Sequence, residues 1–97
     1  MQFMILLSRD PGKAATPTPA DLRETEFQKV RGFYAEGFVQ QIWLRGDTAG
    51  ACMIVEAGSA RDATEKLNTL PLVQAGFLQP PVVVPLKPYS GFAPRPE

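Results

Sequence analysis

The sequence predicts one small α+β domain in which two helices cover one face of an antiparallel, four-stranded sheet. Three observations predict it: apolar strand-like runs alternate with two amphipathic segments, a hydroxyl residue stands three positions before an acid where each amphipathic segment starts, and a glycine-containing turn joins the two middle runs. The resulting β-α-β-β-α-β order is the split βαβ arrangement, with strand order 4-1-3-2. Because 97 residues fit a single core, we assign residues 1–93 to one domain and expect 94–97 to be a flexible C-terminal tail.

The N-terminal half begins with the strand Phe3–Leu7, a continuous apolar run typical of a strand that is covered on both faces. Residues 10–18 contain prolines and a glycine without apolar periodicity, so we expect a loop. A helix is then predicted to start with Thr18 as its cap and Pro19 as its first residue. We expect its buried stripe to consist of Phe27, Val30, Phe33 and Tyr34, and Gly37 to end it.

The C-terminal half supplies the remaining strands. Residues 38–44 alternate in polarity, which predicts a strand with Val39, Gln41 and Trp43 on one face, and residues 51–56 form the returning arm of a hairpin. Ser59 is the predicted cap of a second helix that ends before Pro71. Residues 82–86 are predicted to be an edge strand, because the prolines there cannot donate ladder hydrogen bonds.

Both central strands have apolar residues at consecutive positions, so apolar side chains are expected on both faces of the sheet. The helices can cover only one face. A second copy of the chain, packed face to face as a homodimer or higher homo-oligomer, would cover the other face, on which we expect Met4, Leu6, Cys52 and Ile54.

Composition excludes several classes of function. Ten basic and ten acidic residues give no net charge and form no basic run, so nucleic acid is not an expected partner. The absence of histidine excludes zinc sites and histidine-dependent triads, and no metal or cofactor is expected. Cys52 is the only cysteine, and we interpret it as a core residue. The apolar start of the chain is too short for a signal peptide, which favours a cytoplasmic protein without membrane contact.

Three segments carry a resemblance to a known family: residues 37–44 (GFVQQIWL), 70–77 (LPLVQAGF) and 84–89 (VPLKPY). With them, about residues 1–93 of the chain resemble the ferredoxin-like dimeric α+β barrel superfamily, and within it the muconolactone isomerase-like and YCII-like group. YCII-like proteins generally carry a His-Asp pair, which this chain lacks, so the muconolactone isomerase-like proteins are the closer analogy. The resemblance implies a barrel formed by the sheets of two subunits.

A pocket is expected either between the sheet and the helices or at the dimer boundary. Gln41, Trp43 and Arg45 are spaced so that an amide, an indole N–H and a guanidinium line up on one side of a strand, where they could bind a substrate carboxylate. The alternative is an edge strand with solvated polar side chains and Trp43 packed at an interface. Tyr34 and Phe77 could complete an aromatic wall, or they could serve only in packing.

Proton transfer without histidine or metal would need a carboxylate or a phenol, and Glu56, Glu36 and Tyr89 are the candidates. Glu36 and Glu56 are chosen as the only carboxylates near predicted apolar elements, although carboxylates at element ends are usually just solvated. The first functional hypothesis is a cofactor-independent, isomerase-type enzyme that moves a proton on a small anionic lactone or related metabolite. The alternatives are a non-catalytic dimer that binds a small ligand or another protein, and a cofactorless monooxygenase.

Overall fold

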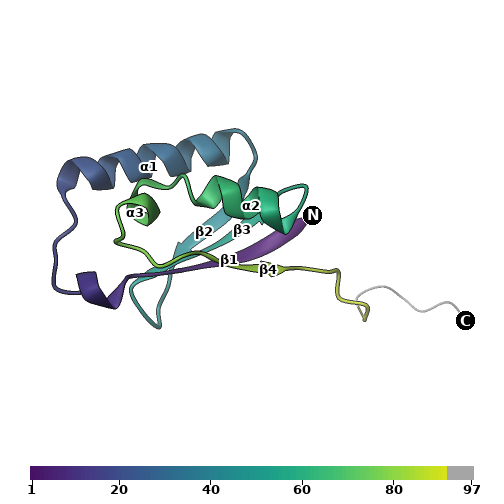
Figure 1. Cartoon of the computed structure of the whole chain (residues 1–97). Helices are drawn as coiled ribbons and strands as arrows, with labels where there is room; N and C mark the ends of the chain where they lie inside the picture. Colours follow the sequence, from purple (N-terminus) through teal and green to yellow (C-terminus); the bar gives the residue numbers. More distant parts are fainter. Residues whose placement is uncertain (92–97) are drawn as a thin grey trace, which may run out of the picture.

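The computed structural model describes residues 1–91 and has the predicted α+β architecture (Figure 1). Its elements, in chain order, are β1 (Gln2–Ser8), the 3₁₀ helix η1 (Pro11–Lys13), α1 (Ala20–Ala35), β2 (Val39–Leu44), β3 (Gly50–Glu56), α2 (Ala60–Leu67), α3 (Pro71–Gln74) and β4 (Val82–Pro85). All neighbouring strands are antiparallel and lie in the order β2-β3-β1-β4, which confirms the predicted strand order and the edge position of β4. The predicted tail, residues 94–97, lies outside the described residues.

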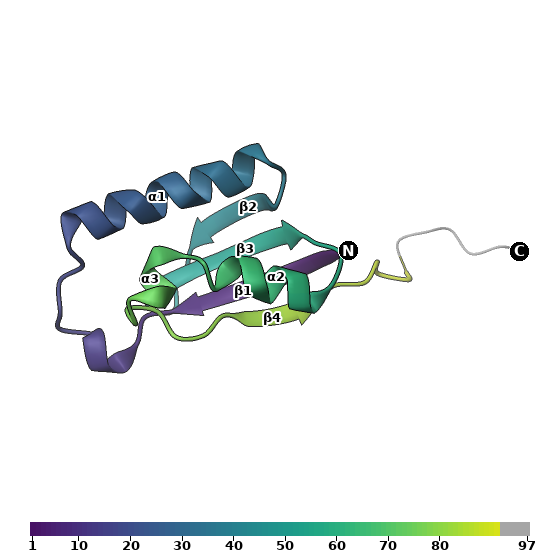
Figure 2. The ribbon, with the colours of Figure 1, turned by 45° about the horizontal axis from the view of Figure 1, so that its top comes forward.

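The helices form one layer on one face of the sheet, as Figures 1 and 2 show. Alternate side chains of β1 and β3 point toward this layer, because successive residues of a strand face opposite sides. They meet Phe33 of α1 and the buried side of α2. The resulting core contains Phe3, Ile5, Leu7, Phe33, Phe38, Val39, Met53, Val55, Ala63, Leu67 and Leu70.

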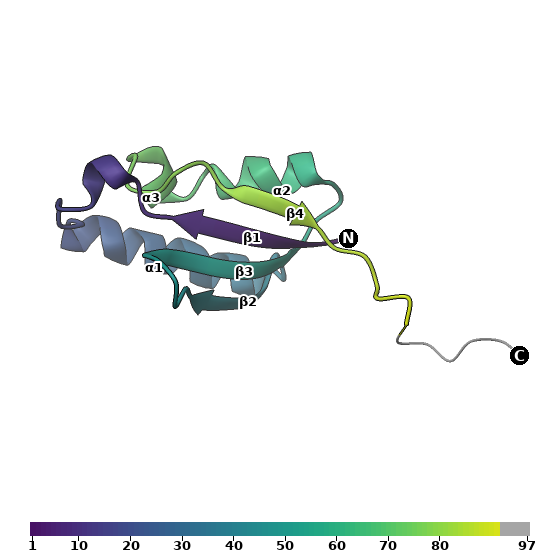
Figure 3. The same cartoon turned by 90° about the horizontal axis from the view of Figure 1, so that it is seen from below.

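The opposite face of the sheet, here called the open face, has no helix over it (Figure 3). The register pairs Met4 with Ile54 and Leu6 with Cys52, so the predicted second apolar face is confirmed. Cys52 was expected in the core, but it is only half-buried. It is paired with Leu6 across β1 and β3, and both side chains lie on the open face, away from the helices. The open face consists of Met4, Leu6, Gln41, Trp43, Cys52, Ile54, Val82 and Val84.

The two helix starts differ from each other. Ser59 caps α2 as predicted, its hydroxyl oxygen accepting a hydrogen bond from the Asp62 backbone N–H at 3.0 Å. The predicted Thr18 cap of α1 is wrong, because Pro19 occupies the cap position and the Thr18 hydroxyl accepts from Arg9 Nη1 at 2.8 Å instead. Gly37 ends α1 with a φ of 87°, a conformation that costs glycine little.

A β-bulge corrects the predicted alternation of β2. Val39 pairs with Val55, whereas Gln41 pairs with Ile54, so Gln40 is an extra residue in this strand. The bulge moves Val39 into the core and leaves Gln41 and Trp43 together on the open face. In residues 10–18, predicted as a loop, the Asp10 side chain caps η1 by accepting from the Gly12 N–H at 2.9 Å. Within residues 1–91, no helix has the length and hydropathy needed to cross a membrane.

Candidate functional site

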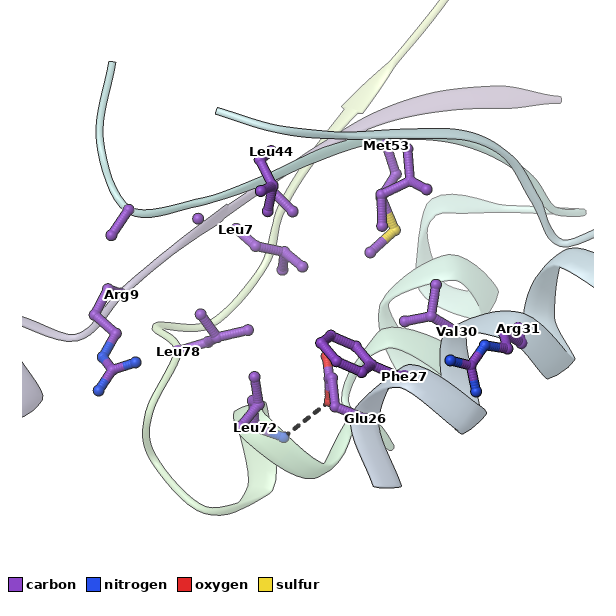
Figure 4. A pocket seen from close by; sticks show the side chains of 14 residues that line it. Leu7, Arg9, Glu26, Phe27, Val30, Arg31, Leu44, Met53, Leu72 and Leu78 are labelled. Carbon is purple, nitrogen blue, oxygen red and sulfur yellow. Dashed lines mark hydrogen bonds between the residues drawn. The ribbon is translucent and has the colours of Figure 1, made fainter. Parts of the chain in front are cut away.

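A pocket of about 570 Å³ lies between α1, the helix-covered face of the sheet and the segment that follows α2 (Figure 4). β1, β2 and β3 form its floor, while α1 and the start of α3 form its walls. The lining is mostly apolar, and Arg9, Glu26 and Arg31 are the charged side chains among the lining residues. The rest of the lining comprises Leu7, Phe27, Val30, Ile42, Leu44, Ala49, Gly50, Ala51, Met53, Leu72 and Leu78.

Glu26 is the acid of this pocket. It shares the inner side of α1 with Val30 and Phe33, because positions four and seven residues apart fall on one face of a helix, and only 7% of its surface is exposed. Its Oε1 accepts a hydrogen bond from the backbone N–H of Leu72 at 3.1 Å, one of the N–H groups that the first turn of α3 leaves unpaired. Burial raises the pKa of the Glu26 carboxyl above its ordinary value, and the hydrogen bond from Leu72 partly opposes that rise.

Arg9 lies at the edge of the pocket beside Leu78, on the side opposite Arg31 (Figure 4). Its guanidinium donates to the Thr18 hydroxyl and to the backbone carbonyls of Lys13 and Thr16, and it stacks 5.0 Å from the centre of the Phe77 ring. These contacts fix the residue 10–18 loop next to the pocket.

The carboxylates proposed from the sequence are elsewhere. Glu56 is half-exposed and accepts from the N-terminal ammonium at 2.6 Å, and Glu36 is half-exposed and paired with Lys66. Tyr89 is 73% exposed in the segment after β4. None of the three lines the pocket, and their catalytic role stays a prediction. The inference that Glu36 and Glu56 alone lie near apolar elements is wrong, since Glu26 is the buried one.

The predicted row on β2 is only partly assembled. Gln41 and Trp43 do share the open face, and Trp43 is 51% exposed there. Arg45, however, donates two hydrogen bonds to Asp47, from Nε at 2.9 Å and from Nη2 at 2.7 Å, and a third from Nη1 to the Ser8 hydroxyl at 2.9 Å. The Arg45 guanidinium holds the pKa of Asp47 below its ordinary value. A carboxylate of the chain itself therefore occupies the position expected for that of a substrate.

The expected aromatic wall does not form. Phe77 is buried, but it packs under the cations of Arg9 and Lys13 rather than lining the pocket. Tyr34 is 65% exposed and does not line the pocket, so its predicted place in the buried stripe of α1 is wrong. Phe27 is also partly exposed, although it does line the pocket. The buried stripe runs through Glu26 because α1 faces the start of α3, whose free N–H group needs an acceptor.

The part of the chain that the structure describes has no candidate metal site: no group of three or more His, Cys, Asp or Glu side chains is placed to hold an ion.

Comparison with known proteins shows a likeness in structure. No protein-family model matches the sequence, and no curated protein matches it. A solved structure of muconolactone isomerase superposes with a TM-score of 0.71 at 17% identity, covering 100% of this chain and 99% of that one. A dehydrochlorinase from Burkholderia phenoliruptrix AC1100, TftG, superposes with a TM-score of 0.70 at 20% identity over 90% of this chain and 94% of its own. The chain shares the fold of both proteins.

The muconolactone isomerase-like fold inferred from the sequence is thereby confirmed. TftG acts on 5-chloro-2-hydroxyhydroquinone and was solved in complex with 2,5-dihydroxybenzoquinone. At 17% and 20% identity the likeness concerns the fold, so the chemistry of this chain has to be argued from its own pocket.

Proposed function

We propose that this protein is a cofactor-independent enzyme that moves a proton on a small, anionic, unsaturated lactone or a related cyclic metabolite, with Glu26 as its acid–base group. The observation that carries the proposal is a buried carboxyl with a raised pKa in a mostly apolar pocket. A general base is most effective when its pKa lies near the working pH, and burial shifts Glu26 in that direction. The fold shared with muconolactone isomerase agrees with this class of reaction.

The geometry of Glu26 suits a reversible proton carrier. The Leu72 N–H holds Oε1, so the other carboxylate oxygen is the one available to a substrate. In the proposed reaction this oxygen takes a proton from the ring carbon that bears the ring oxygen and is conjugated to the lactone carbonyl through the C=C bond, and the electrons of the broken C–H bond spread through that double bond into a dienolate. The same carboxyl then returns the proton to a different carbon, which moves the double bond and leaves the composition of the substrate unchanged. A mostly apolar lining keeps competing water away from the dienolate.

The first half of this reaction also serves a dehydrochlorination. If chloride leaves with the electron pair of its C–Cl bond after the proton has been removed, the product is formed by loss of HCl. The test panel therefore contains muconolactone, its ring-substituted relatives and 5-chloro-2-hydroxyhydroquinone, the substrate named for TftG. Turnover is followed by ultraviolet absorbance, and proton transfer by NMR detection of deuterium uptake from D₂O.

The matched variants are Glu26→Gln and, as control, Glu65→Gln, which changes an exposed carboxylate on α2 that is paired with Arg61. General acid–base catalysis contributes typically 10²- to 10⁴-fold, so Glu26→Gln is expected to lose roughly that factor in kcat, whereas the control keeps its activity. Absence of both turnover and deuterium uptake across the panel would reject the enzymatic proposal.

The second candidate is a non-catalytic protein that binds a small cyclic ligand. The feature that favours it is the composition of the pocket, where Glu26 is the only acid among mostly apolar lining residues. Such a protein is stabilised by its ligand through mass action. A rise in melting temperature with a panel compound, without turnover or deuterium uptake, would support this candidate over the enzyme.

We further infer that a second copy of the chain covers the open face. Two of its apolar side chains, Trp43 and Val82, are more than half exposed in the single chain, and the other apolar residues of the face are partly exposed. A contiguous apolar sheet face of this kind marks an interaction site. Two such faces can pack against each other around a two-fold axis, as in the family that the sequence resembles. Sedimentation at micromolar concentration is expected to give a dimer or a larger homo-oligomer, and a stable monomer would contradict the inference.

A further inference from the structure

The charged groups of the pocket are unequally neutralised. Within residues 1–91, Arg31 forms an ion pair with Glu24 at 3.4 Å and Arg45 forms one with Asp47, whereas Arg9 takes part in none. All the described hydrogen-bond acceptors of Arg9 are neutral: one hydroxyl and two backbone carbonyls. Its Nε is buried and has no hydrogen-bond partner among the described residues. Arg9 is therefore a partly buried cation at the pocket without a counter-charge.

From this we propose that Arg9 is the residue that recognises the anionic group of the ligand, and that the pocket selects small cyclic carboxylates over their neutral esters. This inference refines the proposed function by naming the group that binds the substrate anion in the same pocket. The hydroxyl of Thr18 and the loop carbonyls hold the Arg9 guanidinium in a fixed orientation, so the side chain loses little conformational freedom when an anion binds. A carboxylate that enters the pocket supplies the negative counter-charge that is missing beside the Arg9 guanidinium.

Two other arginines of the chain, Arg45 and Arg31, fit this role less well. Arg45 already donates to both oxygens of Asp47 and does not line the pocket. Arg31 lines the opposite edge of the pocket, but its side chain is 68% exposed, so water screens its charge. A cation at one edge and the Glu26 carboxyl in the wall between α1 and α3 give the ligand a direction, with its anionic end toward β1 and its ring beside Glu26 (Figure 4).

The test compares binding of muconolactone with binding of its methyl ester, measured by isothermal titration calorimetry on the full chain. Wild type is expected to bind the acid more tightly than the ester. Because a hydrogen bond to a charged group is worth more than a neutral one, Arg9→Gln is expected to weaken binding of the acid by roughly 10- to 100-fold and to leave binding of the ester nearly unchanged. Arg9→Lys keeps the positive charge but loses the planar, forked guanidinium, so its affinity for the acid should lie between that of wild type and that of Arg9→Gln.

Arg61→Gln is the matched control, since it removes the same charge from an exposed arginine of α2 that does not line the pocket. It is expected to bind both ligands like wild type. A merely structural role of Arg9, through the loop that it holds, would weaken acid and ester equally, and that result would overturn the proposal. Equal affinity of wild type for acid and ester would overturn it as well.

Turnover is measured separately from this binding comparison, so the enzymatic function and the anion site at Arg9 can be rejected independently of each other. Charge-selective binding that depends on Arg9 but occurs without turnover would reject the enzymatic function and keep the anion site. Turnover of the lactone with no preference for the acid over the ester would keep the enzyme and reject the site.

Discussion

Replacement of Glu26 by glutamine should make the protein more stable at neutral pH and flatten the pH dependence of its stability. Burial raises the pKa of the folded-state carboxyl above the ordinary value of 4.5. The folded chain therefore holds this proton more tightly than the unfolded chain does. As pH rises from the ordinary value through the raised one, the folded state loses stability relative to the unfolded state, and above the raised value the full cost remains. Glutamine has no such titration.

The stability contributed by the hydrogen bond between Glu26 and Leu72 can be measured separately from the effect of the Glu26 charge. Glutamine keeps an oxygen that can accept from the Leu72 N–H, whereas alanine removes both the charge and the acceptor. Leaving a buried donor unpaired costs about 1–3 kcal/mol. For a domain of this size, 1 kcal/mol corresponds to about 4–8 °C in Tm, so Glu26→Ala is expected to melt roughly 4–24 °C below Glu26→Gln.

Urea unfolding of wild type, Glu26→Gln and Glu26→Ala at several pH values between about 4 and 8 measures both effects. The free energy of unfolding of wild type should fall with rising pH relative to that of both variants, and the two variants should differ by a constant offset. Parallel pH curves for all three proteins would refute the reasoning, because they would mean that Glu26 titrates in the folded chain as it does in the unfolded one. Glu26 would then lack the property that recommends it as a base.

Three further predictions concern the scaffold of the site. Leu67→Ala, at a fully buried position of α2, should lower the free energy of unfolding by about 2–5 kcal/mol in urea titration, and a loss well under 1 kcal/mol would contradict the assigned core. Gly50→Ala places a Cβ 1.9 Å from the backbone oxygen of Leu7, so we expect loss of the cooperative unfolding transition seen by circular dichroism, while a wild-type melting curve would speak against this register of β1 and β3. Leu6→Lys puts a charge in the middle of the open face and should convert the expected dimer to monomers in sedimentation, whereas an unchanged dimer would contradict an interface on this face.

Sequence patterns sufficed for the fold wherever one local rule decided the structure. The alternation of Phe3, Ile5 and Leu7 with Met4 and Leu6 places two sets of apolar side chains on opposite faces, and the register confirms both sets. No local signal announced the β-bulge at Gln40, because a bulge is fixed by pairing with β3. The cap at Thr18 failed for a similar reason: its hydroxyl is taken by Arg9, nine residues away.

The candidate site was harder to predict, because its acid resembles an ordinary surface residue of a helix. Glu26 follows Arg23, Glu24 and Thr25, and a helix with many charges gives no reason to bury one of them. The available signal was its spacing of four and seven residues from Val30 and Phe33, but Phe27 competes for the same stripe. What decides between the two is the Leu72 N–H, which belongs to a segment 46 residues further along the chain. A cytoplasmic location stays a prediction of the sequence.

The candidate pocket and the open face lie on opposite sides of one sheet, and this separates the proposed chemistry from the proposed dimer. β1 contributes Leu7 to the pocket and Leu6 to the open face, because successive side chains of a strand point in opposite directions. The acid, the N–H that positions it and the cation at the pocket edge all come from the same chain. A second copy would therefore act on the site mainly through the stability of the sheet, and the assignment of Glu26 does not depend on the oligomeric state.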